Sequence, residues 1–141
     1  MTETRMGNRI TASILFSFRG QTHTPSVELD LDRLMREQGG IPDLYPLIAT
    51  ANGFDLYSYE YEMMLAEPIR FSEPRGLVGE FIHDQGLDTA GFEAAWKEQQ
   101  LQQELQHIAQ QHLPAVDEQE QPRLMEALRQ AYLLGKRSRN D

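Results

Sequence analysis

The chain has 141 residues, the size of one ordinary domain and long enough to bury a substantial hydrophobic core. It contains no cysteine, which excludes disulfides, thiolate nucleophiles and cysteine-based metal sites. Its formal net charge of −9 disfavours nucleic acid as the main partner, because binding to phosphates depends on clustered Lys and Arg side chains. No apolar stretch of about 18 residues is present, so we expect a cytoplasmic protein without a membrane span.

Two strands are predicted near the N-terminus. Apolar residues occupy every second position over 10–18 and again over 27–31, which is the period of a strand that rests one face on a core. The loop between them contains Gly20 and Pro25, so we predict a hairpin. Residues 1–8 are polar, and we expect them to form a disordered tail.

The third predicted strand covers 57–62, where Tyr57, Tyr59 and Tyr61 alternate with polar residues. We expect these tyrosines to face the core, and the alternative is that they stack on a ligand or a partner. The first strand carries no charge over 10–18, whereas the other two carry acids, and charged side chains are typical of exposed sheet edges. The sequence therefore predicts a three-stranded antiparallel sheet in the order 2-1-3.

Two short helices are predicted between the second and third strands. Asp32 is placed to cap a helix over 33–38, which Gly39 ends in a left-handed conformation. Asp43 begins a second helix that covers 43–51 and is closed by the Asn-Gly pair that follows it.

The second half of the chain has the spacing of helices. We predict a helix over 77–82 that Gly86 caps, and a long helix over 88–113 that begins at an aspartate cap and stops at Pro114. A last helix is predicted over 122–135, with a proline in its first turn and a glycine at its end.

Strands followed by helices in this way predict an α+β fold, in which helices cover one face of the sheet. We expect one domain over residues 1–141, with a second disordered tail at 136–141.

Few residues suggest catalysis. His83-Asp84 is the most plausible pair, because a carboxylate can orient an imidazole, and Glu80 lies one turn earlier. Neighbouring side chains on a helix do not face one another, however, and a cation near a helix C-terminus already explains His83. We therefore predict no catalytic site and no cofactor, and His83, Asp84 and Glu80 are the candidates to test.

Metal ligands are not indicated either. His107 and His112 are five residues apart on a predicted helix, which rotates the second by about 140° from the first, so they diverge. We expect His112 to pack at a helix boundary and His107 to face solvent. The acids on the predicted strands cannot wrap around an ion, because strand residues two apart stay about 6.6–6.8 Å from each other. These acids are Glu28, Asp30, Asp32, Glu60 and Glu62.

Aromatic and acidic side chains in the middle of the chain are the candidates for binding, since aromatic residues are enriched at the centres of interfaces. Tyr45 lies beside Pro42 and Pro46, and we expect it to be partly exposed. The candidate binding residues are Tyr45, Tyr57, Tyr59, Tyr61, Glu60 and Glu62.

The long predicted helix carries a narrow apolar stripe within a glutamine-rich sequence, which is typical of a helix–helix contact. The stripe consists of Leu101, Leu105, Ile108 and His112. The last helix supplies a matching stripe of Leu124, Leu128 and Tyr132. We expect the two helices to pair within the chain, with self-association as the alternative.

The run from Ile41-Pro42-Asp43-Leu44-Tyr45 through residues 57–62 to Phe81-Ile82-His83-Asp84 resembles small conserved bacterial proteins of unassigned function. The resemblance covers the middle third of the chain and implies no activity, cofactor or catalytic residue. We predict a non-enzymatic protein-binding or adaptor module with another protein as its partner. The alternative is a small enzyme or small-molecule-binding domain with a pocket between the tyrosine-bearing sheet and the helices.

Overall fold

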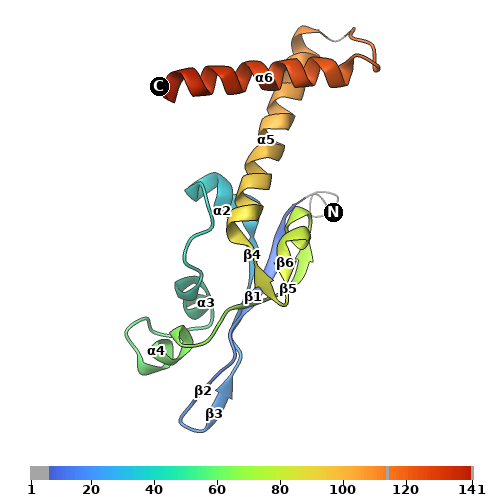
Figure 1. The fold of residues 1–141 in the computed structure, drawn as a ribbon. Helices are drawn as coiled ribbons and strands as arrows, with labels where there is room; N and C mark the ends of the chain where they lie inside the picture. Colours follow the sequence, from blue (N-terminus) through green and yellow to red (C-terminus); the bar gives the residue numbers. More distant parts are fainter. Residues whose placement is uncertain (1–6, 114, 141) are drawn as a thin grey trace. The chain divides into compact units, whose positions relative to one another are not determined.

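A computed structural model describes residues 7–113 and 115–140 of the chain (Figure 1). The predicted α+β class is confirmed, because the strands lie in the N-terminal half and the C-terminal region is helical. The chain divides after Glu93 into two compact units. Helix α5 (Thr89–His112) begins in the first unit and continues into the second. That the whole chain is a single domain stays a prediction.

The first unit is built on a three-stranded antiparallel sheet in the order β4-β1-β5. The strands are β1 (Arg9–Ser13), β4 (Ser26–Asp30) and β5 (Arg70–Arg75). The predicted order 2-1-3 is confirmed, with the first strand in the centre. The guanidinium of Arg9 lies 3.6 Å from the Asp30 carboxylate and 3.9 Å from that of Glu28, so the central strand supplies a cation to the acids of its neighbour.

The first predicted strand is divided into two in the structure, and part of the predicted loop forms a further strand. The hairpin continues beyond β1 and β4 into β2 (Phe16–Phe18) and β3 (Gln21–His23), which are joined by a two-residue turn at 19–20. Between the two ladders the Ile14 N–H donates to the carbonyl oxygen of Pro25 at 3.1 Å. Pro25 has no N–H to return this bond, which explains the interruption.

The predicted third strand over 57–62 is wrong. These residues lie in helix α4 (Tyr59–Leu65) and in the turn before it, and β5 is the third strand of the sheet. The Ser58 hydroxyl caps the helix by accepting a hydrogen bond of 3.1 Å from the Tyr61 N–H. Two glutamates in the first turn add a favourable charge at the helix N-terminus. Local capping therefore decides against the strand that the alternating tyrosines suggested.

Helix α2 (Leu31–Gln38) follows β4 directly. Its N-cap is Asp30, whose side chain accepts from the Arg33 N–H at 3.2 Å, so the predicted cap at Asp32 is wrong by two residues. The predicted end is confirmed, because Gly39 has φ 74° and its N–H bonds to the helix.

Helix α3 (Tyr45–Ala51) ends where the sequence predicts. Gly53 has φ 79°, and the Phe54 N–H returns to the carbonyl oxygen of Ala49 at 2.9 Å. At the other end, the Asp43 carboxylate accepts from the Tyr45 N–H at 3.2 Å, which satisfies one of the amides of the first turn.

The segment before α5 differs from its prediction. It forms a 3₁₀ helix η1 (Leu77–Phe81) and a short hairpin of β6 (Ile82–His83) and β7 (Gly86–Leu87), so Gly86 does not cap a helix. The hairpin turn at 84–85 has φ values of 51° and 66°, a left-handed conformation that Asp adopts more readily than most residues. The predicted cap of α5 is confirmed, since the Asp88 carboxylate accepts from the Gly91 N–H at 3.0 Å.

The core of the first unit gathers apolar side chains from the sheet and from every helical segment around it. Met64 of α4 and Phe92 of α5 are both fully buried, so α4 and the first turns of α5 contribute to this core. The largest fully buried side chains of this unit are Phe92, Ile10, Ile14, Leu31, Ile48, Met64 and Val78.

Asn8 connects three elements of this unit from a buried position, although it falls within the tail that the sequence predicts to be disordered. Its backbone N–H donates to Asp32 at 2.7 Å and its side-chain amide donates to the same carboxylate at 3.0 Å. Its side-chain oxygen accepts from the Val78 N–H at 3.0 Å. Gly76 approaches so closely that an added Cβ would lie 2.8 Å from this oxygen, which explains the glycine. Residues 1–6 of the predicted tail lie outside the described residues.

The second unit contains the rest of α5 and helix α6 (Gln121–Asn140). The predicted end of α6 at Gly135 is wrong, because the helix continues through residues 136–140, which were expected to be disordered. A Cβ at Gly135 would meet nothing within 4 Å, so this glycine interrupts no packing. Pro114 and Asp141, where we predicted a helix stop and a tail, lie outside the described residues.

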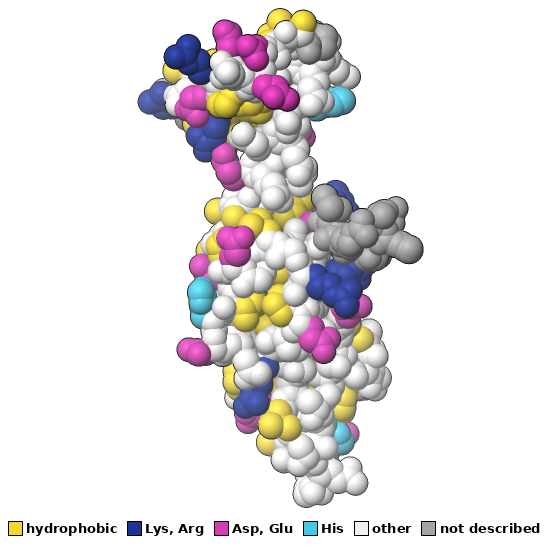
Figure 2. All heavy atoms as spheres, turned by 90° about the vertical axis from the view of Figure 1, so that its right-hand side faces the viewer, with side chains coloured by type: hydrophobic (Ala, Val, Ile, Leu, Met, Phe, Trp, Pro, Cys, Tyr) yellow, Lys and Arg dark blue, Asp and Glu magenta, His cyan; other side chains and the backbone are white. Residues whose placement is uncertain are grey.

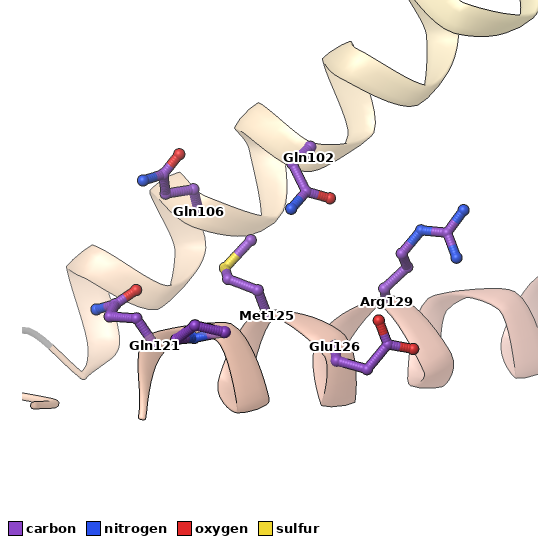
Figure 3. A pocket seen from close by; sticks show the side chains of 7 residues that line it. Gln102, Gln106, Gln121, Met125, Glu126 and Arg129 are labelled. Atoms are coloured by element: carbon purple, nitrogen blue, oxygen red, sulfur yellow. The ribbon is translucent and has the colours of Figure 1, made fainter. Parts of the chain in front are cut away.

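The two helices of this unit contact each other, as predicted. Arg129 of α6 makes two hydrogen bonds to the Glu98 carboxylate of α5, at 2.7 and 2.9 Å. Figure 3 shows Met125 pointing from α6 toward α5. The expected stripe is only partly covered, because Leu105 is buried whereas Ile108 is 46% exposed.

We predict that Asn8→Ala lowers the free energy of unfolding by about 1–3 kcal/mol, because the buried Val78 N–H loses its acceptor. Urea denaturation followed by circular dichroism measures the change. The matched control is Gln38→Ala, which truncates an exposed amide and is expected to stay within about 0.5 kcal/mol. An equal effect of the two substitutions would show that Asn8 does not join these elements.

Candidate functional site

The catalytic candidates do not form a site. His83 lies on β6, Asp84 in the following turn and Glu80 on η1, and all three side chains are exposed. No hydrogen bond or ion pair joins them within the part of the chain that the structure describes. Over the same residues, no group of three or more His, Asp or Glu side chains is arranged to hold a metal ion. These groups therefore share no enclosed environment that would tune them for chemistry.

The other histidines have structural or solvent-exposed positions. His23 stacks on Phe16 with ring centroids 5.0 Å apart and meets the edge of Phe54 at 5.8 Å. His107 is exposed, as predicted, but His112 is exposed as well, so its predicted packing is wrong. The aromatic contacts of His23 stabilise the hairpin against α4 and its preceding turn.

The tyrosines that were candidates for binding divide into two pairs. Tyr45 and Tyr61 are half-buried, and the Tyr45 hydroxyl donates to the backbone carbonyl of Glu67 at 2.7 Å. Partial burial, together with the nearby Asp43 carboxylate, raises the pKa of both phenols above its usual value. The predicted partial exposure of Tyr45 is confirmed. This pair belongs to the contact between α3 and α4.

The other pair lies at the surface. Tyr57 is 97% exposed and Tyr59 is 70% exposed, so the expectation that they face the core is wrong. Met63 is four residues after Tyr59 and therefore shares its side of α4, and it is 44% exposed. Leu56 is 41% exposed. We call these four residues, Leu56, Tyr57, Tyr59 and Met63, the aromatic surface.

The aromatic surface is held on a well-anchored segment. The Asp55 side chain accepts from the Tyr57 N–H at 2.9 Å, and its carbonyl accepts from the Ser58 hydroxyl at 2.6 Å. On the opposite side of α4, Met64 is fully buried. The turn and the buried methionine together fix which side of α4 faces outward, so the exposed side chains are displayed on a defined backbone.

Acidic side chains accompany the aromatic surface. From Glu37 to Ile69 the sequence has no Lys, Arg or His. Glu62 is exposed on α4, and Glu60 is half-buried beside it. The acids of this stretch are Glu37, Asp43, Asp55, Glu60, Glu62 and Glu67. The local potential is therefore negative, and it would attract a cationic partner.

A groove of about 520 Å³ lies along the outer edge of β4, between α2 and α3. One end of this edge is closed, because the side-chain amide of Asn52 donates to the Ser26 carbonyl at 2.9 Å. Glu28 and Asp30 place charges on the same strand. Charged side chains and capped ends usually protect an edge strand against the addition of a further strand. The groove is therefore accounted for as a protected sheet edge, and no ligand is needed to explain its charged lining.

A second groove, of about 400 Å³, lies between α5 and α6 (Figure 3). Three glutamines line it together with Met125 and Arg129, and the Arg129 guanidinium is already bonded to Glu98. The other charged residue of the groove is Glu126, whose carboxylate accepts from the Gln130 side-chain amide at 2.6 Å, so both charged side chains already have partners within the helical unit.

The comparisons do not assign the chain to a family: no protein-family model, curated protein or solved structure matches it. In the described part of the chain, no helix combines the length and the apolar composition needed to cross a bilayer. Of the aromatic surface, Leu56 and Met63 were missed in the sequence. The signal that would have found Met63 is Ser58, a helix cap that places it one turn after Tyr59.

We predict that Tyr57→Ala changes the free energy of unfolding by less than about 0.5 kcal/mol, because its side chain is exposed. Met64→Ala, on the buried side of the helix that follows this turn, is expected to cost about 2–5 kcal/mol. Urea denaturation of both variants tests the orientation of α4. If Tyr57→Ala were the more damaging change, the tyrosines would face inward.

Proposed function

We propose that the chain is a non-enzymatic protein-binding module and that its aromatic surface docks on a basic partner protein. The observation that carries the proposal is the exposure of Tyr57, at 97%, next to Tyr59, at 70%. Large aromatic side chains are usually placed where they exclude water, and Tyr is among the residues most enriched at binding hot spots. Their exposure on an anchored turn and the helix that follows it supports a surface that is covered in a complex.

The partner is defined by charge. The surface lies within a stretch that has acids and no basic residue, so a partner with Lys or Arg around an apolar patch would complement it. Glu62 is exposed close in sequence to Met63 and is placed to meet such a cation at the rim. Nucleic acid has the wrong charge for this surface. The absence of cysteine suits a reducing compartment, and we place the interaction in the cytoplasm.

The alternative, a small enzyme or ligand-binding domain, required a pocket between a tyrosine-bearing sheet and the helices. The tyrosines lie on α3, on α4 and in the turn before α4, not on the sheet, and His83 lies exposed on the β6–β7 hairpin. In the described part of the chain, neither of the two grooves above is lined by His83 or by the acids of α4, and no observation favours this alternative.

We predict that a phage-displayed library of random 12-residue peptides, selected on the full chain, enriches peptides that combine Lys or Arg with apolar residues. Fluorescence polarisation then measures the dissociation constant of the enriched peptide. Tyr57→Ala with Tyr59→Ala should raise this constant about tenfold or more, since truncating two interface aromatics removes most of the anchoring contact. Glu60→Gln with Glu62→Gln should raise it by a smaller factor.

The matched control is Tyr132→Ala, which truncates an exposed tyrosine outside the aromatic surface and should leave the dissociation constant unchanged. The proposal is overturned if no peptide is enriched, if the enriched peptides are acidic, or if their binding survives the double tyrosine substitution.

A further inference from the structure

Asn52 joins the C-terminal end of α3 to the edge strand β4. Its side-chain amide nitrogen donates to the carbonyl oxygen of Ser26 at 2.9 Å and to that of Ile48 at 2.8 Å. The first bond closes one end of the β4 edge, and the second satisfies a carbonyl group in the last turn of the helix. One amide group therefore ties the end of α3 to the sheet.

The residue after Asn52 makes this amide susceptible to hydrolysis. Of the three asparagines in the sequence, only Asn52 precedes a glycine, whose backbone nitrogen is not shielded by a side chain. When this nitrogen bonds to the side-chain carbonyl carbon of Asn52, a cyclic succinimide forms. The side-chain nitrogen leaves as ammonia and takes the proton of Gly53 with it. Water then opens the ring to aspartate or to isoaspartate, in which the backbone runs through the former side chain.

The fold holds this reaction back. The ψ angle of Asn52 is 11°, which places the Gly53 nitrogen beside the backbone nitrogen of Asn52 and away from its side chain. The Gly53 N–H also donates to the carbonyl oxygen of Thr50 at 3.2 Å. The nitrogen that must leave is the one bonded to β4 and to the last turn of α3. Attack therefore requires the end of α3 to separate from the strand first.

We propose that Asn52 is a latent modification site, which reacts when α3 separates from β4 and whose product keeps the two apart. The product carboxylate has no hydrogen to donate, so the two carbonyl oxygens that were bonded at 2.8 and 2.9 Å would face a negative charge. This charge also lies at the C-terminal end of a helix, where an anion is unfavourable. The modified chain therefore leaves the β4 edge open at Ser26. The reaction needs only water and is independent of the proposed partner.

The sequence around Asn52 supplies no cation for the new charge, because no Lys, Arg or His occurs from Glu37 to Ile69. Arg9, which pairs with the acids of β4, lies beside Asp30 at the opposite end of the strand from Ser26. Figure 2 shows the side of the first unit that faces away from α3, where Lys and Arg side chains lie among acidic ones. The product therefore adds a like charge to an acidic segment, which favours the open arrangement.

The rate of the reaction tests the latent state. The full chain is incubated in mildly alkaline buffer, with and without denaturing urea, and peptide mapping by mass spectrometry measures isoaspartate at residue 52. The folded wild-type chain should react at least about tenfold more slowly than the denatured chain, because only the open state reacts. Ile48→Ala, which truncates a fully buried side chain of α3, should speed the reaction of the folded chain about tenfold. The matched control is Leu47→Ala, at a position that is 37% exposed, which should change the rate less than about twofold.

Two substitutions at residue 52 test the effect of the product. Asn52→Ala removes the two hydrogen bonds, whereas Asn52→Asp also introduces the carboxylate. In urea denaturation, Asn52→Asp should lower the equilibrium constant for folding about threefold to tenfold more than Asn52→Ala does. The inference is overturned if the folded wild-type chain reacts as fast as the denatured chain, or if Leu47→Ala speeds the reaction as much as Ile48→Ala. A chain with Asn52→Asp that is as stable as the one with Asn52→Ala also overturns it.

Discussion

The hydrogen bonds of Asn8 are the constraint on which the first unit depends. One buried side chain holds the start of α2 through the Asp32 carboxylate and the start of η1 through the Val78 N–H. The backbone of the same residue accepts from the Leu31 N–H at 2.9 Å, so β1, β4 and α2 meet at one point. Because a buried amide must be paired, this arrangement fixes η1, the segment that precedes β6, β7 and α5, beside the residue that leads into the central strand β1. The core between the sheet and its helices is therefore closed by polar contacts at one end.

The parts of the fold that follow from local chemistry were predictable. The placement of charges predicted the central strand, since most of β1 falls within the uncharged residues 10–18. The ends of two helices were marked by Gly39 and by Asn52-Gly53. The third strand was not predictable from its period. Six residues of alternating tyrosine satisfy both a strand and the two sides of a short helix, and the Ser58 cap decides between them. The identity of β5 depends on pairing with β1, a contact that is distant in the sequence.

The candidate site shows the same division. Tyr57 and Tyr59 were identified as binding residues from their type, but whether they face inward depends on which side of α4 packs, and Met64 settles this by tertiary burial. His83 and Asp84 were expected on a helix, but they lie at a hairpin turn that leaves both in solvent, and helical spacing alone does not reveal this turn. In the second unit, the stripe predicted on α6 is half-buried at Leu124 and Leu128 and exposed at Tyr132, a difference that the sequence period does not reveal.

The stretch from Glu37 to Ile69 has a consequence for the response to dissolved salt. Glu37 is paired with Arg33 at 3.0 Å, but the other five carboxylates of this stretch, Asp43, Asp55, Glu60, Glu62 and Glu67, repel one another across α3, α4 and the turn between them. Added ions screen this repulsion, with a screening length of about 10 Å at 0.1 M, so this part of the chain gains rigidity as ionic strength rises. The same ions weaken the attraction for a cationic partner. Salt thus strengthens the segment that carries the aromatic surface while it lowers the affinity of that surface.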